Sequence, residues 1–208
     1  MQSTPIHFMT IREQADLLSS GEITSVELTR HFLDRADELD PPPFELPSEP
    51  RSDHDGMLST MVTIAREHAL EAAERADNEL RAGRRRSILH GIPYGVKDLL
   101  DTDGIRTTWG SRIFHDRVPT RNAAVIDRLA ASGAVLMAKM SLGEFAGGNT
   151  SSALNPWKLD RTSFGSSSGT VSAAVAGLIG FGIGTETGGS IVFLASSVGA
   201  SGLRPTFS

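Results

Sequence analysis

The stretch GIPYGVKDLLDT, residues 91 to 102, places one lysine, Lys97, inside a short apolar run. An apolar run of this length that begins after a glycine is typical of a buried strand. Such a strand would carry Lys97 into the interior, where lysines are rare unless they are paired. We therefore expect a strand that places an amine inside the fold, with an ordinary solvated lysine as the alternative.

Similar apolar runs follow along the chain and alternate with helical patterns. AVLMAK (134–139) and GLIGFGIG (177–184) are two such runs, and NAAVIDRLAASG (122–133) precedes the first of them with a helical pattern. SGTVSAAVAGLIG (168–180) is rich in small residues, which favours a buried helix that leads into the last run. Strands that alternate with helices predict an α/β layer architecture.

The N-terminal part of the chain is predicted to be helical. TIREQADLLSSG (10–21) and TSVELTRHFLDRADELD (24–40) each begin with the T-x-x-E spacing of a capping box and continue with an amphipathic pattern. Residues 41–56 contain five prolines and are expected to form a linker. A third helix is predicted over roughly residues 64–82, with an alanine-rich face that allows close packing.

Composition describes an ordinary globular chain and narrows the classes of function. Of the 208 residues 39% are hydrophobic, and the formal net charge of −5 gives no basic surface of the kind that nucleic acid requires. The absence of cysteine excludes disulfides, thiolate metal sites and a cysteine nucleophile. The first twenty residues hold no continuous apolar run, so we expect no signal peptide, no membrane span and a cytoplasmic location.

Two segments rich in glycine and serine, FGSSSGT (164–170) and GTETGGSIV (184–192), allow four interpretations. They could be structural turns, or a phosphate-binding loop that lacks the lysine of a Walker motif. Residues 165–169 also match the G-x-S-x-G of hydrolases, but all six histidines precede them, so the usual chain order of that triad cannot be completed. The fourth interpretation is a Ser–Ser–Lys relay, in which a buried lysine activates a serine.

Metal-dependent hydrolysis has no support in the sequence. The chain contains no H-E-x-x-H motif, and its histidines are scattered singly along the N-terminal part. Lone histidines are more often surface or packed residues than ligands. We therefore expect no metal site.

Three blocks of the sequence, in this order, resemble the amidase signature family of amide hydrolases. They are GIPYGVKDLLDTDGIRTTWGS (91–111), NPWKLDRTSFGSSSGT (155–170) and GIGTETGGSIVFLASSVGASGLRPT (182–206), and residues 20–40 are similar to the opening helices of the family. The resemblance implies a mixed sheet flanked by helices. Family members continue well beyond the position of residue 208, so the sheet is expected to be incomplete at the C-terminal end.

The resemblance also implies a division of the chain and a set of residue roles. Residues 1–60 would form an N-terminal helical arm with a Pro-rich linker, and residues 61–208 a partial amidase signature core. Ser190 would be the acylated nucleophile, Ser166 the bridging serine beside a cis peptide bond, and Lys97 the base. The oxyanion hole would consist of four backbone N–H groups, those of Thr187, Gly188, Gly189 and Ser190.

From this resemblance we expect hydrolysis of a small-molecule carboxylic amide through an acyl-enzyme on Ser190, without a metal or organic cofactor. A lysine with a pKa of about 10.4 is almost wholly protonated at pH 7, and burial can lower that pKa by about 3–5 units. Two alternatives stay open. One is a catalytically inactive, truncated fragment that acts by association with a partner, and the other is a glutamine-hydrolysing amidotransferase subunit that needs partner subunits.

Several positions differ from the residues that are commonest in the family, among them Glu186, where aspartate is frequent, and Ser163-Phe164, where Pro-Gly is more usual. Val192 stands where arginine is frequent, which removes an ion-pair partner for Glu186. Leu194 stands where proline is usual and frees a backbone φ angle that proline would fix. Phe164 places a bulky ring near the bridging serine. None of these changes deletes a group of the expected relay.

Overall fold

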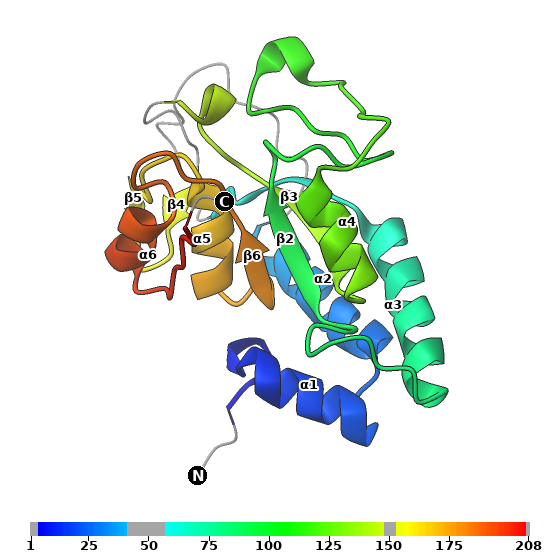
Figure 1. Cartoon of the computed structure of the whole chain (residues 1–208). Coiled ribbons are helices and arrows are strands. Elements are labelled where there is room, and N and C mark those ends of the chain that lie inside the picture. Colours follow the sequence, from blue (N-terminus) through cyan, green and yellow to red (C-terminus); the bar gives the residue numbers. More distant parts are fainter. Residues whose placement is uncertain (1–3, 41–56, 148–152, 207–208) are drawn as a thin grey trace.

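Four strands form a mixed sheet at the centre of the chain (Figure 1). The computed structural model describes residues 4–40, 57–147 and 153–206. The order across the sheet is β1 (Met61–Ile64), β3 (Val135–Met140), β2 (Pro93–Lys97) and β6 (Phe181–Ile183). β2 runs parallel to β3 and to β6, whereas β1 is antiparallel to β3. The predicted mixed α/β fold is confirmed, and β2, which carries Lys97, lies between two parallel neighbours.

A small second sheet and several helices complete the described chain. β4 (Leu154–Asn155) and β5 (Lys158–Thr162) form an antiparallel pair. The helices after the first two are α3 (Arg66–Arg81), α4 (Ala124–Ala131), α5 (Ser168–Val175) and α6 (Val192–Val198), with short 3₁₀ turns η1 (Ile6–Phe8), η2 (Arg112–Phe114) and η3 (Glu144–Ala146). The helix expected over 64–82 begins at residue 66, because the preceding residues form the edge strand β1, which the sequence pattern did not predict.

The first two helices, α1 (Ile11–Ser20) and α2 (Ser25–Leu39), begin as predicted. At the start of α1 the Thr10 hydroxyl accepts a hydrogen bond from the Glu13 N–H, and the Glu13 carboxylate accepts one from the Thr10 N–H. The same reciprocal pair forms at the start of α2. Gly21 ends α1 with a φ of 75°, a left-handed conformation that glycine adopts without steric cost.

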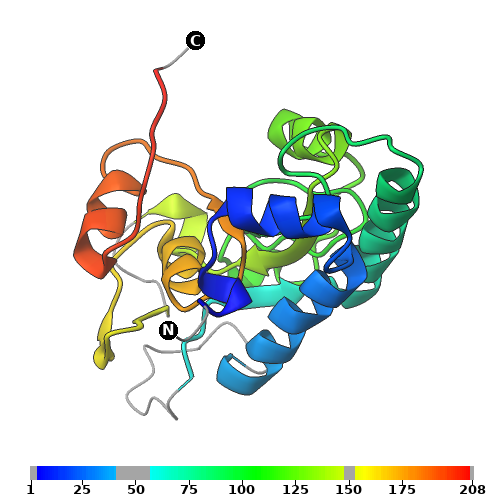
Figure 2. The same cartoon turned by 90° about the horizontal axis from the view of Figure 1, so that it is seen from below.

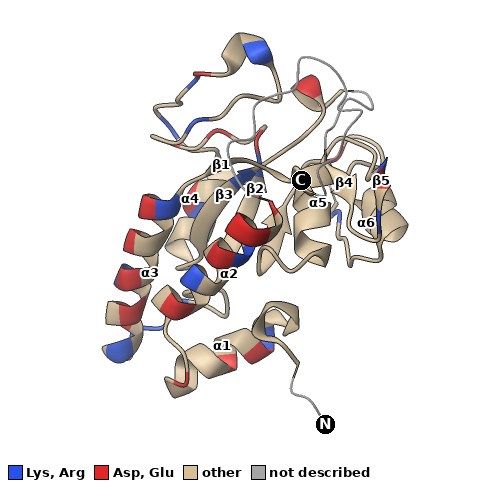
Figure 3. Cartoon of the chain, turned by 180° about the vertical axis from the view of Figure 1, so that it is seen from behind, with Lys and Arg blue, Asp and Glu red and all other residues tan. Residues whose placement is uncertain are grey.

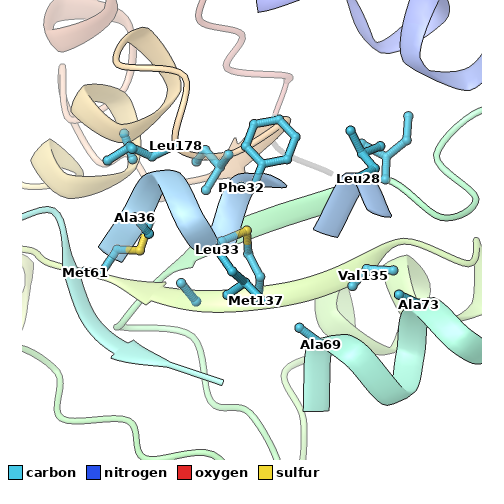
Figure 4. Close-up of a cluster of buried hydrophobic side chains, with 14 of the residues drawn as sticks. Leu28, Phe32, Leu33, Ala36, Met61, Ala69, Ala73, Val135, Met137 and Leu178 are labelled. Carbon is cyan, nitrogen blue, oxygen red and sulfur yellow. The ribbon is translucent and has the colours of Figure 1, made fainter. Parts of the chain in front are cut away.

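α2 packs its apolar face against the sheet and α3 (Figure 4). The fully buried side chains Leu28, Phe32 and Leu33 of α2 belong to one cluster with Met137 of β3. The buried alanines of α3 at positions 69 and 73 leave room for the two helices to lie close. Burial of each large side chain contributes about 1.5–3 kcal/mol to folding. Charged residues occur along both helices (Figure 3), and the buried Asp77 of α3 accepts hydrogen bonds from two backbone N–H groups at the start of α2.

The N-terminal helices therefore share one hydrophobic core with the sheet. η1 lies beside the C-terminal end of α5 (Figure 2), where a side chain at Gly177 would meet the His7 ring. The predicted linker, residues 41–56, lies outside the described residues, and the division of the chain at residue 60 stays a prediction. No helix in the described ranges is both long enough and apolar enough to cross a membrane.

Candidate active site

The end of β2 places Lys97 in the interior of the fold. Lys97 is 0% exposed, because β2 has a strand on either side and helices over its faces. Its Nζ lies 2.7 Å from Ser166 Oγ and donates to Thr185 Oγ1 at 2.8 Å. In the described part of the chain no carboxylate pairs with this amine, and all its hydrogen-bond partners are hydroxyl or carbonyl oxygens.

Burial lowers the pKa of Lys97 from its ordinary value to about 8, because the interior disfavours the charged amine. At pH 7 roughly one molecule in ten would then hold a neutral lysine, which is the form that can accept a proton. The remaining cost of deprotonation at this pH is about 1.4 kcal/mol, against about 4.6 kcal/mol for an unperturbed lysine. Burial therefore makes a neutral base available near pH 7.

Ser166 lies between Lys97 and Ser190. It is 3% exposed and immediately precedes the turn that enters α5, and the Gly165–Ser166 peptide bond is cis, as the resemblance implied. Its Oγ lies 3.1 Å from Ser190 Oγ. The structure therefore brings the three expected relay residues together in one hydrogen-bonded row, although 69 residues separate Lys97 from Ser166 and 24 separate Ser166 from Ser190.

The segment before Ser190 exposes its backbone. Gly189 has a φ of 87°, which favours glycine, and a side chain at Gly188 would meet no other atom within 4 Å. Among the described residues, the N–H groups of Thr187, Gly188 and Ser190 have no hydrogen-bond partner. The Gly189 N–H instead interacts with the Glu186 carboxylate. Most of the expected oxyanion donors are therefore open to a substrate, and Gly189 is the member that is engaged elsewhere.

Glu186 supports the same segment from the other side. Its Oε2 accepts hydrogen bonds from the Ile191 N–H at 2.7 Å and the Val192 N–H at 2.8 Å, directly after Ser190. These backbone donors, that of Val192 foremost, lower the pKa of the Glu186 carboxyl. Val192 cannot supply the ion pair that an arginine at this position would, and Arg204 Nε lies 3.4 Å from Glu186 Oε1 instead.

Leu194 and Phe164 also differ from the residues that are usual in the family, and both have packing partners in the structure. Leu194 is fully buried in α6 and packs in a small cluster with Val171 of α5. An apolar contact therefore anchors α6 at this position. Phe164 has a φ of 63° and forms an edge-to-face pair with Phe193, with ring centroids 5.9 Å apart. Both rings are about half exposed beside the serine row.

A second buried lysine, Lys139, lies on β3 and was not predicted from the sequence. Its Nζ donates to Leu100 O at 2.6 Å and to the Thr102 and Thr107 hydroxyls at 2.9 and 2.7 Å, and lies 3.7 Å from Asp98 Oδ1. Asp98 Oδ2 accepts from both the N–H and the hydroxyl of Thr108. The signal was present, because AVLMAK places a lysine in an apolar run just as PYGVK does.

The charges of Lys139 and Asp98 act against the effect of burial on the pKa of each residue. Burial lowers the pKa of Lys139 to about 8, while the nearby Asp98 acts in the opposite direction. Burial raises the pKa of Asp98, and Lys139 counteracts that rise. The pair holds the loop after β2 against β3. Within the described residues no group of His, Asp and Glu side chains has the arrangement of a metal site.

Comparison with known proteins gives concordant matches over most of the chain. A sequence profile of the Amidase family matches residues 51–208. The chain is 37% identical over 210 residues to the A subunit of glutamyl-tRNA(Gln) amidotransferase from Acinetobacter baylyi, covering 98% of this chain and 39% of that protein. The corresponding protein of Marinomonas sp. is 40% identical over 204 residues, covering 95% of this chain and 39% of that protein.

Solved structures match the fold as well. Peptide amidase from Stenotrophomonas maltophilia superposes with a TM-score of 0.78 at 31% identity, covering 92% of this chain and 39% of that one. Fatty acid amide hydrolase gives a TM-score of 0.76 at 25% identity, covering 93% of this chain and 33% of that one. The chain spans about two-fifths of the length of the curated relatives that it matches.

Proposed function

Because this chain belongs to the Amidase family, we propose that it hydrolyses a carboxylic amide through an acyl-enzyme on Ser190. Lys97 Nζ, Ser166 Oγ and Ser190 Oγ form the row, with spacings of 2.7 and 3.1 Å, that carries this proposal. Both spacings are within hydrogen-bond reach, so a proton can pass along the row in either direction. The lowered pKa of Lys97 supplies a base at the far end.

Acylation starts when neutral Lys97 accepts the proton of Ser166, which takes the proton of Ser190. The Ser190 oxygen attacks the carbonyl carbon, and the resulting oxyanion is stabilised by the open backbone N–H groups of Thr187, Gly188 and Ser190. As the carbon–nitrogen bond breaks, the proton returns from Lys97 through Ser166 to the leaving amine. The products of this half of the reaction are an ester on Ser190 and a free amine or ammonia.

Deacylation repeats the transfer with water in place of the amine. Water gives a proton to the row and attacks the ester carbon, and the proton returns to the Ser190 oxygen as the ester bond breaks. The acyl group leaves as a carboxylic acid. The enzyme returns to its starting state with no net change in protonation.

A second candidate is an amidotransferase component that takes its amide from glutamine. It is favoured by the 37–40% identity with the A subunit of glutamyl-tRNA(Gln) amidotransferase over nearly the whole of this chain. The same relay would release ammonia, and partner subunits would use it. Ammonia release from glutamine, compared with release from simple aliphatic and aromatic amides, separates the two candidates. The cytoplasmic location expected from the sequence stays a prediction.

The test is labelling of the purified chain with a fluorophosphonate, a reagent that reacts with activated serines, followed by peptide mapping. We expect a label on Ser190, loss of labelling in Ser190→Ala and Lys97→Ala, and unchanged labelling in the control Ser196→Ala, which alters an exposed serine of α6. A folded chain that takes no label would overturn the proposal. It would favour the inactive alternative, in which the chain acts by association with a partner.

A further inference from the structure

A cavity of about 250 Å³ lies between α3, α4 and the strands β2 and β3. The small side chains of Ala72 and Ala76 of α3 and Ala130 of α4 line it, together with longer side chains of the same helices. An engineered protein cavity of about 150 Å³ is large enough to bind benzene. This cavity therefore has room for a ring-sized molecule that carries a further group.

The cavity lies on the opposite face of the sheet from the serine row. Successive side chains of a strand point to opposite faces, so Tyr94 and Lys97 of β2 point away from each other. Tyr94 packs with Ile126 of α4 and Leu136 of β3 on the α4 side of the sheet, which Figure 1 shows in front of β3. A ligand here would not contact the proposed catalytic residues.

Tyr94 lines the cavity and carries a hydroxyl that can form a hydrogen bond. Its side chain is 1% exposed, its ring is stacked on Phe181 with centroids 5.1 Å apart, and the residue lines the cavity. Among the described residues no hydrogen bond to its hydroxyl is formed, and this hydroxyl is not one of the fully buried polar atoms that lack a partner. A tyrosine hydroxyl that keeps some accessible surface can pair with water or a ligand. Burial also raises the pKa of Tyr94, so the hydroxyl stays protonated and can donate.

The charged side chains around the cavity compensate one another. Glu79 accepts a hydrogen bond from Arg86 Nε at 2.7 Å, pairs with a second guanidinium nitrogen, and lies 3.3 Å from His90 Nε2. The His90 Nδ1 accepts from the Arg86 N–H, so the neutral ring donates from Nε2 toward Glu79. The two other charged groups of the lining, Arg75 and Asp103, have opposite signs. The lining carries no net charge, which disfavours an ionic ligand.

We propose that this cavity is a binding site for a small uncharged molecule with a ring-sized apolar body and one hydrogen-bonding group that pairs with the Tyr94 hydroxyl. The alanines of α3 and α4 would contact the body, and Tyr94 would orient the polar end. The site is separate from the serine row, so binding is expected whether or not the chain hydrolyses amides.

Tyr94 is the only tyrosine of the chain, which makes the test direct. The full chain is labelled with ¹³C-tyrosine and titrated with phenol, a neutral probe of the proposed size, while the ring signals are followed by NMR. We expect a saturable shift of this single set of signals. Ala130→Leu, which fills the cavity from an exposed position, should weaken binding at least tenfold.

The control is Ala131→Leu, which adds the same side chain at the neighbouring exposed residue outside the lining and should leave binding unchanged. Ser190→Ala should also bind phenol as the parent does. Calorimetry on Tyr94→Phe, which keeps the ring and deletes the hydroxyl, should show at least fivefold weaker binding. A shift that grows linearly with phenol and does not saturate would overturn the proposed site. So would an Ala130→Leu variant that keeps its melting temperature and binds phenol as tightly as the parent chain. Tighter binding of benzoate than of phenol would overturn the uncharged class.

Discussion

Lys97 and Lys139 occupy neighbouring strands, are both fully buried, and have pKa values lowered to about 8, yet their surroundings differ. Lys97 contacts hydroxyls and a carbonyl, and one of those hydroxyls leads on to Ser190. Lys139 is held by three oxygen acceptors and faces Asp98. Burial alone therefore does not make a lysine a base. The neighbours decide whether its proton can leave along a useful path or is kept as a structural charge.

The largest expected difference between the two lysines is chemical. Lys97→Ala should lower the rate of fluorophosphonate labelling by about 10²–10⁴-fold, the usual contribution of a general base, while leaving the chain folded. The rate is measured from time courses at several probe concentrations, with circular dichroism as the folding check. Lys158→Ala, at an exposed lysine, is the matched control. If Lys97→Ala were labelled at the same rate as the parent chain, the chemical difference expected between Lys97 and Lys139 would be contradicted.

The second difference concerns stability. Lys139→Met should lower the free energy of unfolding by about 3–5 kcal/mol, because it leaves Asp98 buried without its cation. Urea denaturation measures the change, and the double variant Lys139→Met/Asp98→Asn should recover part of the loss. Lys97→Ala should not lower the free energy of unfolding by this much, since it leaves no carboxylate buried without a partner. If Lys139→Met were as stable as the parent chain, the Lys139–Asp98 pair would make no net contribution to stability.

The pH dependence sharpens the comparison. Below pH 8 the labelling rate should rise about tenfold per pH unit and level off near the lowered pKa of Lys97, because only the neutral amine accepts a proton. Between about pH 8 and the ordinary lysine pKa, the unfolded chain binds more protons than the folded one, so stability should rise with pH in that window. Rate profiles and urea curves from about pH 6 to 10.5 check both. A rate that levels off only near pH 10 would contradict the burial effect.

The smallest expected effect belongs to Arg204. Its guanidinium contacts Glu186 from a half-exposed position, and exposed ion pairs contribute little. Arg204→Gln should therefore slow labelling by a factor of about five at most. Glu186→Gln should have a larger effect, because the Ile191 and Val192 N–H groups lose a charged acceptor. Comparison of the two rates, with Arg161→Gln as an exposed control, shows whether the backbone contacts or the ion pair hold the segment around Ser190.

Local patterns in the sequence predicted the elements that local chemistry determines. The capping boxes of α1 and α2 and the apolar runs of β2 and β3 could be recognised because each depends on neighbouring residues. β1 was missed because its four residues run directly into the pattern of α3.

Contacts between distant parts of the chain could not be read in the same way. The Arg204–Glu186 pair joins residues that only the turn of α6 brings together. The cage around Lys139 depends on the loop after β2, whose course the sequence does not specify. The apolar run predicted that Lys97 is buried, whereas its link to Ser166 and Ser190 came from family resemblance, and the roles of the three residues stay predictions until they are measured.

The order of the strands has a consequence for the newly made chain. β2 leaves the ribosome long before β6, its parallel neighbour, and the hydroxyl that links Lys97 to Ser190 lies 69 residues downstream of that lysine. Parallel pairing over such a separation forms late, after the intervening helices are available to cover it. The amine and the two serines therefore meet only after β6 has paired with β2. A growing chain that has not yet reached Ser190 cannot form the row, so we expect reactivity at Ser190 only after this pairing.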